Sequence, residues 1–309
     1  MIKRFLTIFT KNYWKYIFSI KKTFNAALGT LGIIWLLIEP TSYFSQGLSD
    51  FFKAHWLWLL VLGGIWVIYE NWPKTEFCYK LNERDIRIQI SIGNLFDYKG
   101  HLVIPINTSY DTSFEGDLIA NTSTQGQFTI KYFKEPRYLD QDLTIALACE
   151  PPTTQLPQKN RGNKYRYDIG KVLKLKLEND KYAFLSAISD MNNNGVAETN
   201  FDNIQTSLGS LWSYVSTNGE SGQINIPIIG TGRGRLIDSR EKVIKSIINS
   251  FVSATTETER RFCDKLNIVI HPKDFSEHQI NIDELTRYLE LKCDFYEYDT
   301  RRTGVGQAI

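Results

Sequence analysis

The sequence predicts an α/β protein with a mixed, largely parallel sheet sandwiched by helices and preceded by an N-terminal transmembrane helical hairpin. Two observations lead to this fold class. Two uncharged apolar runs lie within residues 1–74, and beyond them apolar strand-like runs alternate with segments of helical spacing. Such alternation is typical of a sheet covered by helices, because each crossover helix packs its apolar side against the strands. We therefore expect a membrane module over residues 1–74 and a globular domain over residues 75–309.

Length, charge and residue usage exclude several classes of function. A chain of 309 residues accommodates one domain of roughly 200 residues and a smaller module. The net charge of +2 provides no basic field for nucleic acid, so a bound anion must be held locally. The four cysteines and four histidines show no metal-ligand spacing. We expect neither a metal nor a cofactor, and we expect reduced, buried cysteines in a cytosolic domain.

The N-terminal module has the composition of a membrane anchor. Residues 1–22 mix aromatic and aliphatic side chains with basic ones and contain no acid, which indicates a helix lying on an anionic membrane surface. The uncharged runs 24–38 and 54–69 are slightly short for membrane spans, but tryptophan and tyrosine near their ends favour spanning. A pair of buried helices in a soluble bundle is the alternative.

The distribution of basic residues predicts how the chain crosses the inner membrane of the cell. Lysine and arginine flank the outer ends of the two runs, whereas the loop at 39–53 contains a single lysine. The positive-inside rule therefore places the N-terminus and the large domain in the cytoplasm, with only residues 42–53 outside.

The rest of the chain follows the alternating pattern. Strands are predicted at residues 85–92, 101–106, 171–177, 182–188, 223–229, 266–270 and 293–298. Helices are predicted at residues 125–133, 203–215, 239–253 and 283–291, while residues 139–149 fit either element.

A glycine-rich loop after the predicted strand 223–229 has the pattern of an anion-binding site. Glycine lets backbone N–H groups turn toward a phosphate, the next helix contributes its positive end, and arginine adds charge-assisted donors. The expected contacts are Gly230, Thr231, Gly232, Arg233, Gly234 and Arg235. The alternative is a tight turn with two solvated arginines. A second polar loop begins at Asn107, and both loops leave the carboxyl ends of strands, so they can face one crevice.

Four short motifs occur in a fixed order along residues 84–299. They are Gly-Asn-Leu-Phe at 93–96, Val-Ile-Pro-Ile-Asn at 103–107, Gln-Gly-Gln at 125–127 and Pro-Ile-Ile-Gly-Thr-Gly at 227–232. In these motifs the segment resembles a macro domain, the family of ADP-ribose-binding modules. The resemblance implies a macro-domain-like fold that binds an ADP-ribose-type nucleotide.

The resemblance also implies roles for individual residues. Asn94 takes the place of the acidic residue that contacts adenine, Asn107 holds the distal ribose, and Gln125 with Gly126 forms the first phosphate loop. His271 and Phe275 are expected to stack on adenine, with a core or surface role as the alternative, just as Asn107 can instead cap its strand. No equivalent of the hydrolytic residues is present, so binding is favoured over turnover and no catalytic residue is expected.

A two-span anchor fused to such a domain resembles the membrane effectors of Thoeris antiphage defence. In that family a partner TIR-domain enzyme converts NAD into an amino-acid conjugate of ADP-ribose, whose binding drives homo-oligomerisation in the lipid bilayer. The resemblance therefore implies an antiviral receptor that disrupts the membrane. A membrane-tethered ADP-ribosyl hydrolase and a membrane adaptor without nucleotide affinity are the two alternatives.

Overall fold

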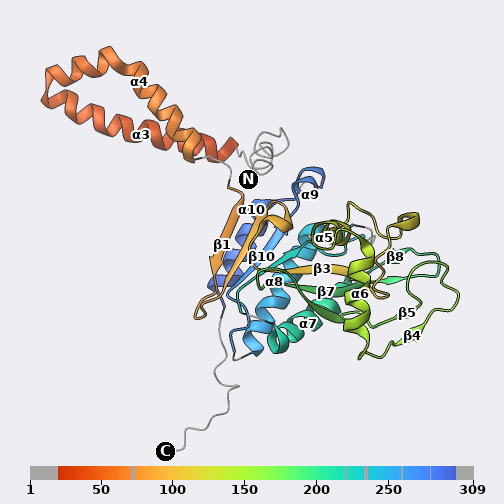
Figure 1. Cartoon of the computed structure of the whole chain (residues 1–309). Coiled ribbons are helices and arrows are strands. Elements are labelled where there is room, and N and C mark those ends of the chain that lie inside the picture. Colours follow the sequence, from red (N-terminus) through yellow and green to blue (C-terminus); the bar gives the residue numbers. More distant parts are fainter. Residues whose placement is uncertain are drawn as a thin grey trace, which may run out of the picture. The chain divides into compact units, whose positions relative to one another are not determined.

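The computed structural model describes residues 20–70, 74–219, 221–232, 236–258, 260–278 and 280–296. The chain divides into two compact units, Met1–Thr75 and Glu76–Ile309, whose ribbons are drawn in Figure 1. The predicted interfacial helix falls almost wholly on residues 1–19, outside the described residues.

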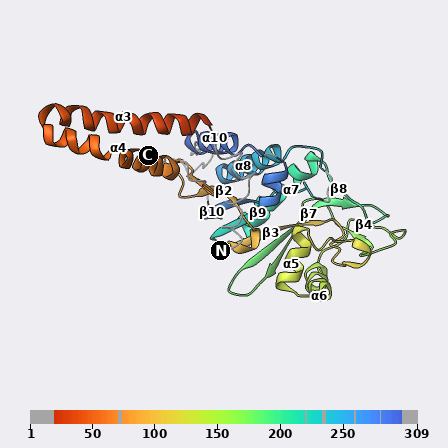
Figure 2. The ribbon, with the colours of Figure 1, turned by 90° about the horizontal axis from the view of Figure 1, so that it is seen from above.

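The N-terminal unit is a pair of antiparallel helices, α3 (Ile20–Phe44) and α4 (Gln46–Glu70), which lie side by side in Figures 1 and 2. Gly63 lies where they approach each other, because a Cβ there would stand 3.4 Å from Thr30 Cγ2 and 3.5 Å from Ile34 Cδ1. Large apolar side chains are exposed on both helices, for example Trp35 at 65% and Trp58 at 66%. By length and composition Thr23–Pro40 suffices to cross a membrane, and the apolar segment Ala54–Val67 is shorter.

The predicted loop at 39–53 is wrong, because only Ser45 separates the two helices. Pro40 lies inside α3 although an interior proline removes one helical hydrogen bond and crowds the carbonyl four residues before it. An irregularity close to the predicted loop is a kink within α4 at His55, where φ is −116° and ψ is 17°. The His55 ring bonds to the carbonyl of Phe51 at 2.9 Å, and a side chain inserted into the helical ladder is a known cause of kinks.

The second unit is built on a mixed sheet with the strand order β1-β2-β10-β9-β3-β7-β6, and β8 pairs with β7. The five central strands run parallel, and β1, β6 and β8 pair antiparallel with their neighbours. The strands of the sheet are β1 (Glu76–Lys80), β2 (Arg87–Ile92), β3 (His101–Asn107), β6 (Val172–Lys176), β7 (Tyr182–Met191), β8 (Ala197–Glu198), β9 (Gln223–Pro227) and β10 (Lys265–Ile270). A separate two-stranded ladder joins β4 (Thr154–Gln155) to β5 (Tyr165–Arg166).

Helices cover both faces of this sheet. Figure 2 shows α7, α8 and α10 on one side, and α5 and α6 on the other. The helices are α5 (Thr124–Tyr132), α6 (Pro136–Leu147), α7 (Phe201–Asn218), α8 (Arg240–Glu257), α9 (Pro272–Glu277) and α10 (Ile282–Asp294), with short 3₁₀ turns η1 (Leu95–Asp97) and η2 (Glu115–Asp117). The core under α5 and α6 joins Phe128, Leu139 and Leu143 to apolar side chains of β3, β6 and β7. The mixed sheet sandwiched by helices confirms the predicted fold class for this unit.

Two predictions for this unit are wrong. The predicted strand at 293–298 is wrong for residues 293–296, since α10 continues to Asp294 and no strand follows it up to residue 296; residues 297 and 298 lie outside the described residues. The buried residues of α10, Ile282, Leu285, Leu289 and Cys293, recur every three or four positions, which is helical spacing. The cysteines are not uniformly buried either: Cys78 and Cys149 are exposed, while Cys263 and Cys293 are buried.

Candidate functional site

A cleft of about 780 Å³ crosses the carboxyl ends of the parallel strands. One end lies at β2 and β10, its middle at the loop after β9, and the other end at β3, β7 and β8. In α/β sheets, ligands bind at this edge because loops and helix N-termini converge there. Seven of the twelve predicted ligand-binding residues line the cleft, namely Asn94, Asn107, Gln125, Gly230, Thr231, Gly232 and His271.

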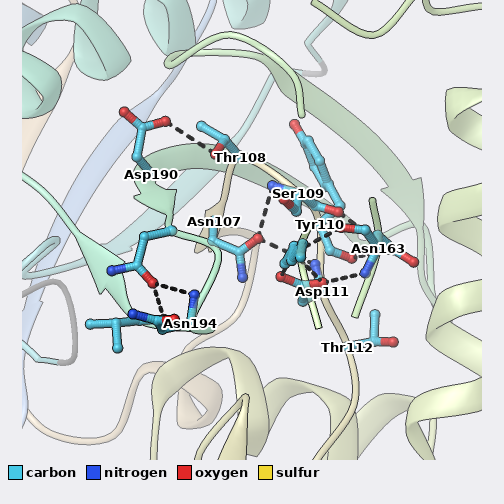
Figure 3. Close-up of polar contacts among 12 residues, drawn as sticks. Asn107, Thr108, Ser109, Tyr110, Asp111, Thr112, Asn163, Asp190 and Asn194 are labelled. Carbon is cyan, nitrogen blue, oxygen red and sulfur yellow. Dashed lines mark hydrogen bonds and ion pairs between the residues drawn. The ribbon is translucent and has the colours of Figure 1, made fainter. Parts of the chain in front are cut away.

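Asn107 presents an amide to this cleft from the last position of β3. Its side chain is only 3% exposed, and its Oδ1 accepts the backbone N–H groups of Ser109 at 2.9 Å and Asp111 at 3.3 Å. The Nδ2 atom is buried and has no hydrogen-bond partner within the part of the chain that the structure describes. Figure 3 shows this nitrogen pointing away from the two bonds that hold the oxygen. A buried donor without a partner costs about 1–3 kcal/mol, so it is a natural contact for a ligand oxygen.

The turn after Asn107 is held by a buried ion pair that no sequence pattern predicts. Lys159 Nζ lies 2.7 Å from Asp111 Oδ2, and both side chains are fully buried. Asn163 donates its backbone N–H to Asp111 Oδ1 at 2.7 Å (Figure 3). Burial raises the pKa of the Asp111 carboxyl, against the opposing effect of the Lys159 ammonium. Tyr110 occupies a left-handed conformation with φ 53° and is completely buried.

The N-terminus of α5 forms the wall of the cleft opposite the strand ends. Ser123 caps the helix by accepting the Gly126 N–H at 3.0 Å, and Thr122, Ser123 and Gln125 line the cleft. Gly126 itself does not line the cleft; a Cβ at this position would stand 2.1 Å from the carbonyl oxygen of Ala120. Its role is therefore to allow the close approach of the helix to the preceding turn. The Gln125 amide donates to the carbonyl of Asp111 at 2.5 Å, which ties α5 to the Asn107 turn.

The loop after β9 requires glycine at its first turn. Gly230 has φ 77°, and a Cβ there would lie 2.7 Å from Ile204 Cδ1. Thr231 and Gly232 follow it on the cleft wall. The predicted contacts Arg233, Gly234 and Arg235 lie outside the described residues.

Arg240 lines the cleft and was missed at the sequence level. Its guanidinium pairs with Asp274 Oδ1 at 3.3 Å and donates to the Thr231 carbonyl at 3.4 Å, so it links the glycine loop to α9. The side chain is 16% exposed. A signal was present: an arginine directly after the N-cap Ser239 is opposed by the helix dipole, and such a placement favours an anion ligand or an acidic partner.

The end of the cleft at β2 and β10 contains Asn94 and His271. The Asn94 Oδ1 accepts the Phe96 N–H at 3.0 Å, and His271 Nδ1 accepts the Lys273 N–H at 3.2 Å. Burial lowers the pKa of His271, so the ring is neutral near pH 7 with its proton on Nε2. The expected stacking of Phe275 is wrong for this conformation, because its side chain is 1% exposed, belongs to the core and does not line the cleft.

A second, larger groove of about 1220 Å³ lies along α7, α8 and α10. It contains none of the predicted ligand-binding residues, and it lies on a helical face instead of at strand ends. We therefore assign the candidate site to the smaller cleft. Among the described residues, no group of three His, Cys, Asp or Glu side chains is arranged to hold a metal ion.

Comparison with known proteins agrees with this geometry. The family model for the Thoeris protein ThsA, Macro domain, matches residues 88–271, more than half of the chain. Thoeris protein ThsA of Bacillus amyloliquefaciens (strain Y2) is 25% identical over 235 residues, which cover 73% of this chain and 77% of that protein.

Solved structures with similarity to the chain include macrodomains. The Oceanobacillus iheyensis macrodomain with MES bound is 14% identical, covers 69% of this chain and 98% of its own, and has a TM-score of 0.45. The Trypanosoma brucei macrodomain in complex with ADP-ribose is 12% identical. The match covers 65% of this chain and 68% of that chain, with a TM-score of 0.40. The resemblance found in the sequence motifs is confirmed by the family match, which extends from β2 to His271 and so includes the loops of the cleft. The chain belongs to the Thoeris ThsA macro-domain family.

Proposed function

We propose that this protein is a membrane-anchored receptor that binds an ADP-ribose-derived signal in the cleft at the strand ends. The observation that supports this most directly is the buried, unpartnered Nδ2 of Asn107 among the described residues. In the free protein this donor is unsatisfied, and a ribose hydroxyl of a bound nucleotide would supply the missing acceptor. Membership of the ThsA macro-domain family supports this ligand class.

The proposed ligand lies along the length of the cleft. Adenine occupies the end at Asn94 and His271, where the neutral imidazole offers a flat face. The diphosphate lies between the glycine loop and the capped N-terminus of α5, because both supply backbone N–H groups and the helix adds its positive end. Arg240 provides a cation on that wall, and we propose that Arg233, Gly234 and Arg235 add to it. The distal ribose then reaches Asn107.

Binding without turnover is the favoured activity. At the end formed by β3, β7 and β8 the cleft is lined by the Asn107 amide, the Ser189 hydroxyl and apolar side chains, whereas the charged groups among the described lining residues lie on α8 and at α9. General acid–base catalysis needs a titratable group near the reacting atom. From the resemblance to Thoeris effectors, we propose that the signal is an amino-acid conjugate of ADP-ribose and that a TIR-domain partner enzyme makes it.

The N-terminal unit is proposed to insert into the inner membrane as a two-span hairpin. Its apolar side chains are exposed on both helices, and aqueous exposure of so large an apolar surface is unfavourable. We retain the proposed topology, with the N-terminus and the ligand-binding domain in the cytoplasm, since the basic residues flank the outer ends of the hairpin. The segment outside is then helical, not a loop.

The output proposed for ligand binding is homo-oligomerisation and membrane disruption. Because Gly63 is already used where α3 meets α4, the open positions Gly29 and Gly64 remain for contact with a second copy. Ligand can drive such assembly only if it binds the assembled state more tightly than the free chain.

Calorimetry of the full-length chain in detergent tests the binding step. Saturable heat with ADP-ribose or an amino-acid-linked derivative, without product release, supports the receptor. Release of ADP-ribose from modified protein would identify a hydrolase, and absence of affinity for every derivative would leave the membrane adaptor. Dye leakage from liposomes and the size of the detergent complex, with and without ligand, test the output.

A further inference from the structure

The residue of interest is Lys159, which lies in the excursion between α6 and β6 and does not line the cleft. This lysine is 2% exposed, which is rare because a buried ammonium must have its donors satisfied. Here they are satisfied: Nζ donates to Asp111 Oδ1 at 3.0 Å, to Asp111 Oδ2 at 2.7 Å and to the Asn163 carbonyl at 2.8 Å. Replacing a buried pair by apolar residues is often neutral or stabilising, so stability alone does not account for it.

The pair acts on the backbone that orients Asn107. Asp111 donates its N–H to Asn107 Oδ1 at 3.3 Å, and its carbonyl accepts the Gln125 amide at 2.5 Å. The carboxyl of the same residue is fixed by Lys159 and by the backbone N–H of Asn163. Asp111 is thus the point where this excursion is connected to two side chains that line the cleft.

The excursion follows the turn closely along its length. The Asn163 amide donates to the carbonyls of Ser109 at 3.2 Å and Tyr110 at 3.1 Å. Gly162 permits this approach, because with φ 73° a Cβ there would lie 2.0 Å from Asp111 Oδ1. The left-handed backbone of Tyr110 is unfavourable for a residue with a Cβ, so surrounding contacts must maintain it.

We propose that Lys159 is a positioning residue for ligand binding, which acts through Asp111 to keep the Asn107 amide nitrogen directed into the cleft. The reason is the two-fold character of an amide. If the N–H groups of Ser109 and Asp111 did not hold Oδ1, a rotation of 180° would present an acceptor to the ligand hydroxyl in place of the donor. The effect of Lys159 on affinity rests on the proposed function. The effect of Lys159 on the conformation of the Asn107 turn does not depend on any ligand.

The test uses full-length protein in detergent and ADP-ribose as the probe. Lys159→Met keeps the length of the side chain and removes the charge. Lys171→Met is the control, because Lys171 belongs to the same excursion and its side chain pairs with Glu150 instead of contacting the Asn107 turn. We expect Lys159→Met to weaken binding about 5- to 50-fold, no more than Asn107→Ala does, and Lys171→Met to change it by less than about 2-fold.

A double variant distinguishes positioning from general destabilisation. In an Asn107→Ala background, Lys159→Met should cost no further affinity, because the group through which it acts is already absent. A multiplicative loss in the double variant would overturn the inference. If Lys159→Met fails to fold because Asp111 is left charged and unpaired, Lys159→Met combined with Asp111→Asn replaces it, since the side-chain oxygen of the introduced asparagine can still accept the Asn163 N–H.

Deuterium exchange of the ligand-free protein tests the role of Lys159 by a measurement that does not depend on ligand binding. Lys159→Met should speed exchange in residues 107–111 at least about 5-fold and leave residues 265–270 of β10 unchanged. If the wild-type protein bound no ADP-ribose, the proposed function would fail, and this exchange would still decide the role of Lys159. Unchanged exchange at residues 107–111 would overturn it.

Discussion

Replacement of Asn107 by alanine tests the proposed ligand contact, with stability measured beside affinity. The Asn107 oxygen accepts two backbone N–H groups, each worth about 0.5–1.5 kcal/mol, whereas the unpartnered nitrogen costs about 1–3 kcal/mol in the free protein. These contributions oppose each other. The alanine also leaves the buried N–H groups of Ser109 and Asp111 without this acceptor, so we expect the free energy of unfolding of Asn107→Ala to fall by about 1–3 kcal/mol.

Ligand binding should respond to the same change through the nitrogen, not the oxygen. The bond from the amide nitrogen to a ligand hydroxyl removes the desolvation cost of a buried donor, so its loss should weaken ADP-ribose binding by about 1–3 kcal/mol, or roughly 5- to 150-fold. Titration calorimetry measures the affinity, and urea denaturation of the same preparation measures the stability.

Asn192→Ala is the matched control. The Asn192 oxygen accepts the N–H groups of Asn194 and Val196, both at 3.0 Å, in the same spacing of two and four residues (Figure 3 draws this turn at the labelled Asn194). Its nitrogen donates to Glu198, and the residue does not line the cleft. This variant should lose about 1 kcal/mol of stability and retain full affinity. Equal affinity losses in the two variants, or no loss in either, would refute the assignment of Asn107.

Further predictions concern other parts of the domain. Gly126→Ala should destabilise the protein by about 1–3 kcal/mol and weaken ADP-ribose binding, measured by melting and calorimetry, because its Cβ would stand 2.1 Å from a backbone carbonyl. Arg240→Leu should weaken binding of ADP-ribose by about 1.5–3 kcal/mol but not that of adenosine, through loss of a charge-assisted donor near the diphosphate. Burial and a neighbouring lysine lower the pKa of Lys181 from 10.5 to about 8, so the unfolded state binds more protons between these values. The free energy of unfolding of the wild type should therefore rise between about pH 8 and pH 10.5 relative to that of Lys181→Met. The same pH dependence of urea unfolding in both proteins would contradict this. In native protein a maleimide should label the exposed Cys149 and spare Cys263, whose pKa burial raises to about 12. Labelling of Cys149 in intact cells by an impermeant reagent would contradict the cytoplasmic placement.

Sequence patterns were sufficient for the fold class and for the position of the cleft. Alternation and continuous apolar runs predicted β2, β3, β7, β9 and β10 within a few residues, because buried parallel strands need apolar side chains on both faces. Since the carboxyl ends of parallel strands meet at one edge, loops far apart in the chain could be assigned to one crevice. The positions of Asn107 and Gly230 on the cleft wall follow from that rule, while their contact with a ligand stays a prediction.

Local patterns were insufficient where neighbouring elements decided the conformation. Residues 293–298 have a strand-like composition, yet Cys293 continues the buried face of α10. Phe275 was expected in the site because it follows a strand end, but the first turn of α9 directs it into the core. In the hairpin, Pro40 looked like the end of a helix and instead lies within one.

The pairing of buried polar groups became visible only in the folded chain. Asp111 and Lys159 are 48 residues apart in the chain, so no motif connects them, and their ion pair exists because the excursion after α6 returns to the end of β3. Arg240 likewise pairs with Asp274, 34 residues away in the chain, because α9 packs near the start of α8. Apolar periodicity encodes which face of an element is buried, whereas the partner of a buried charge depends on the path of the whole chain. That is why the sequence predicted Asn107, and only the fold showed what holds its amide in place.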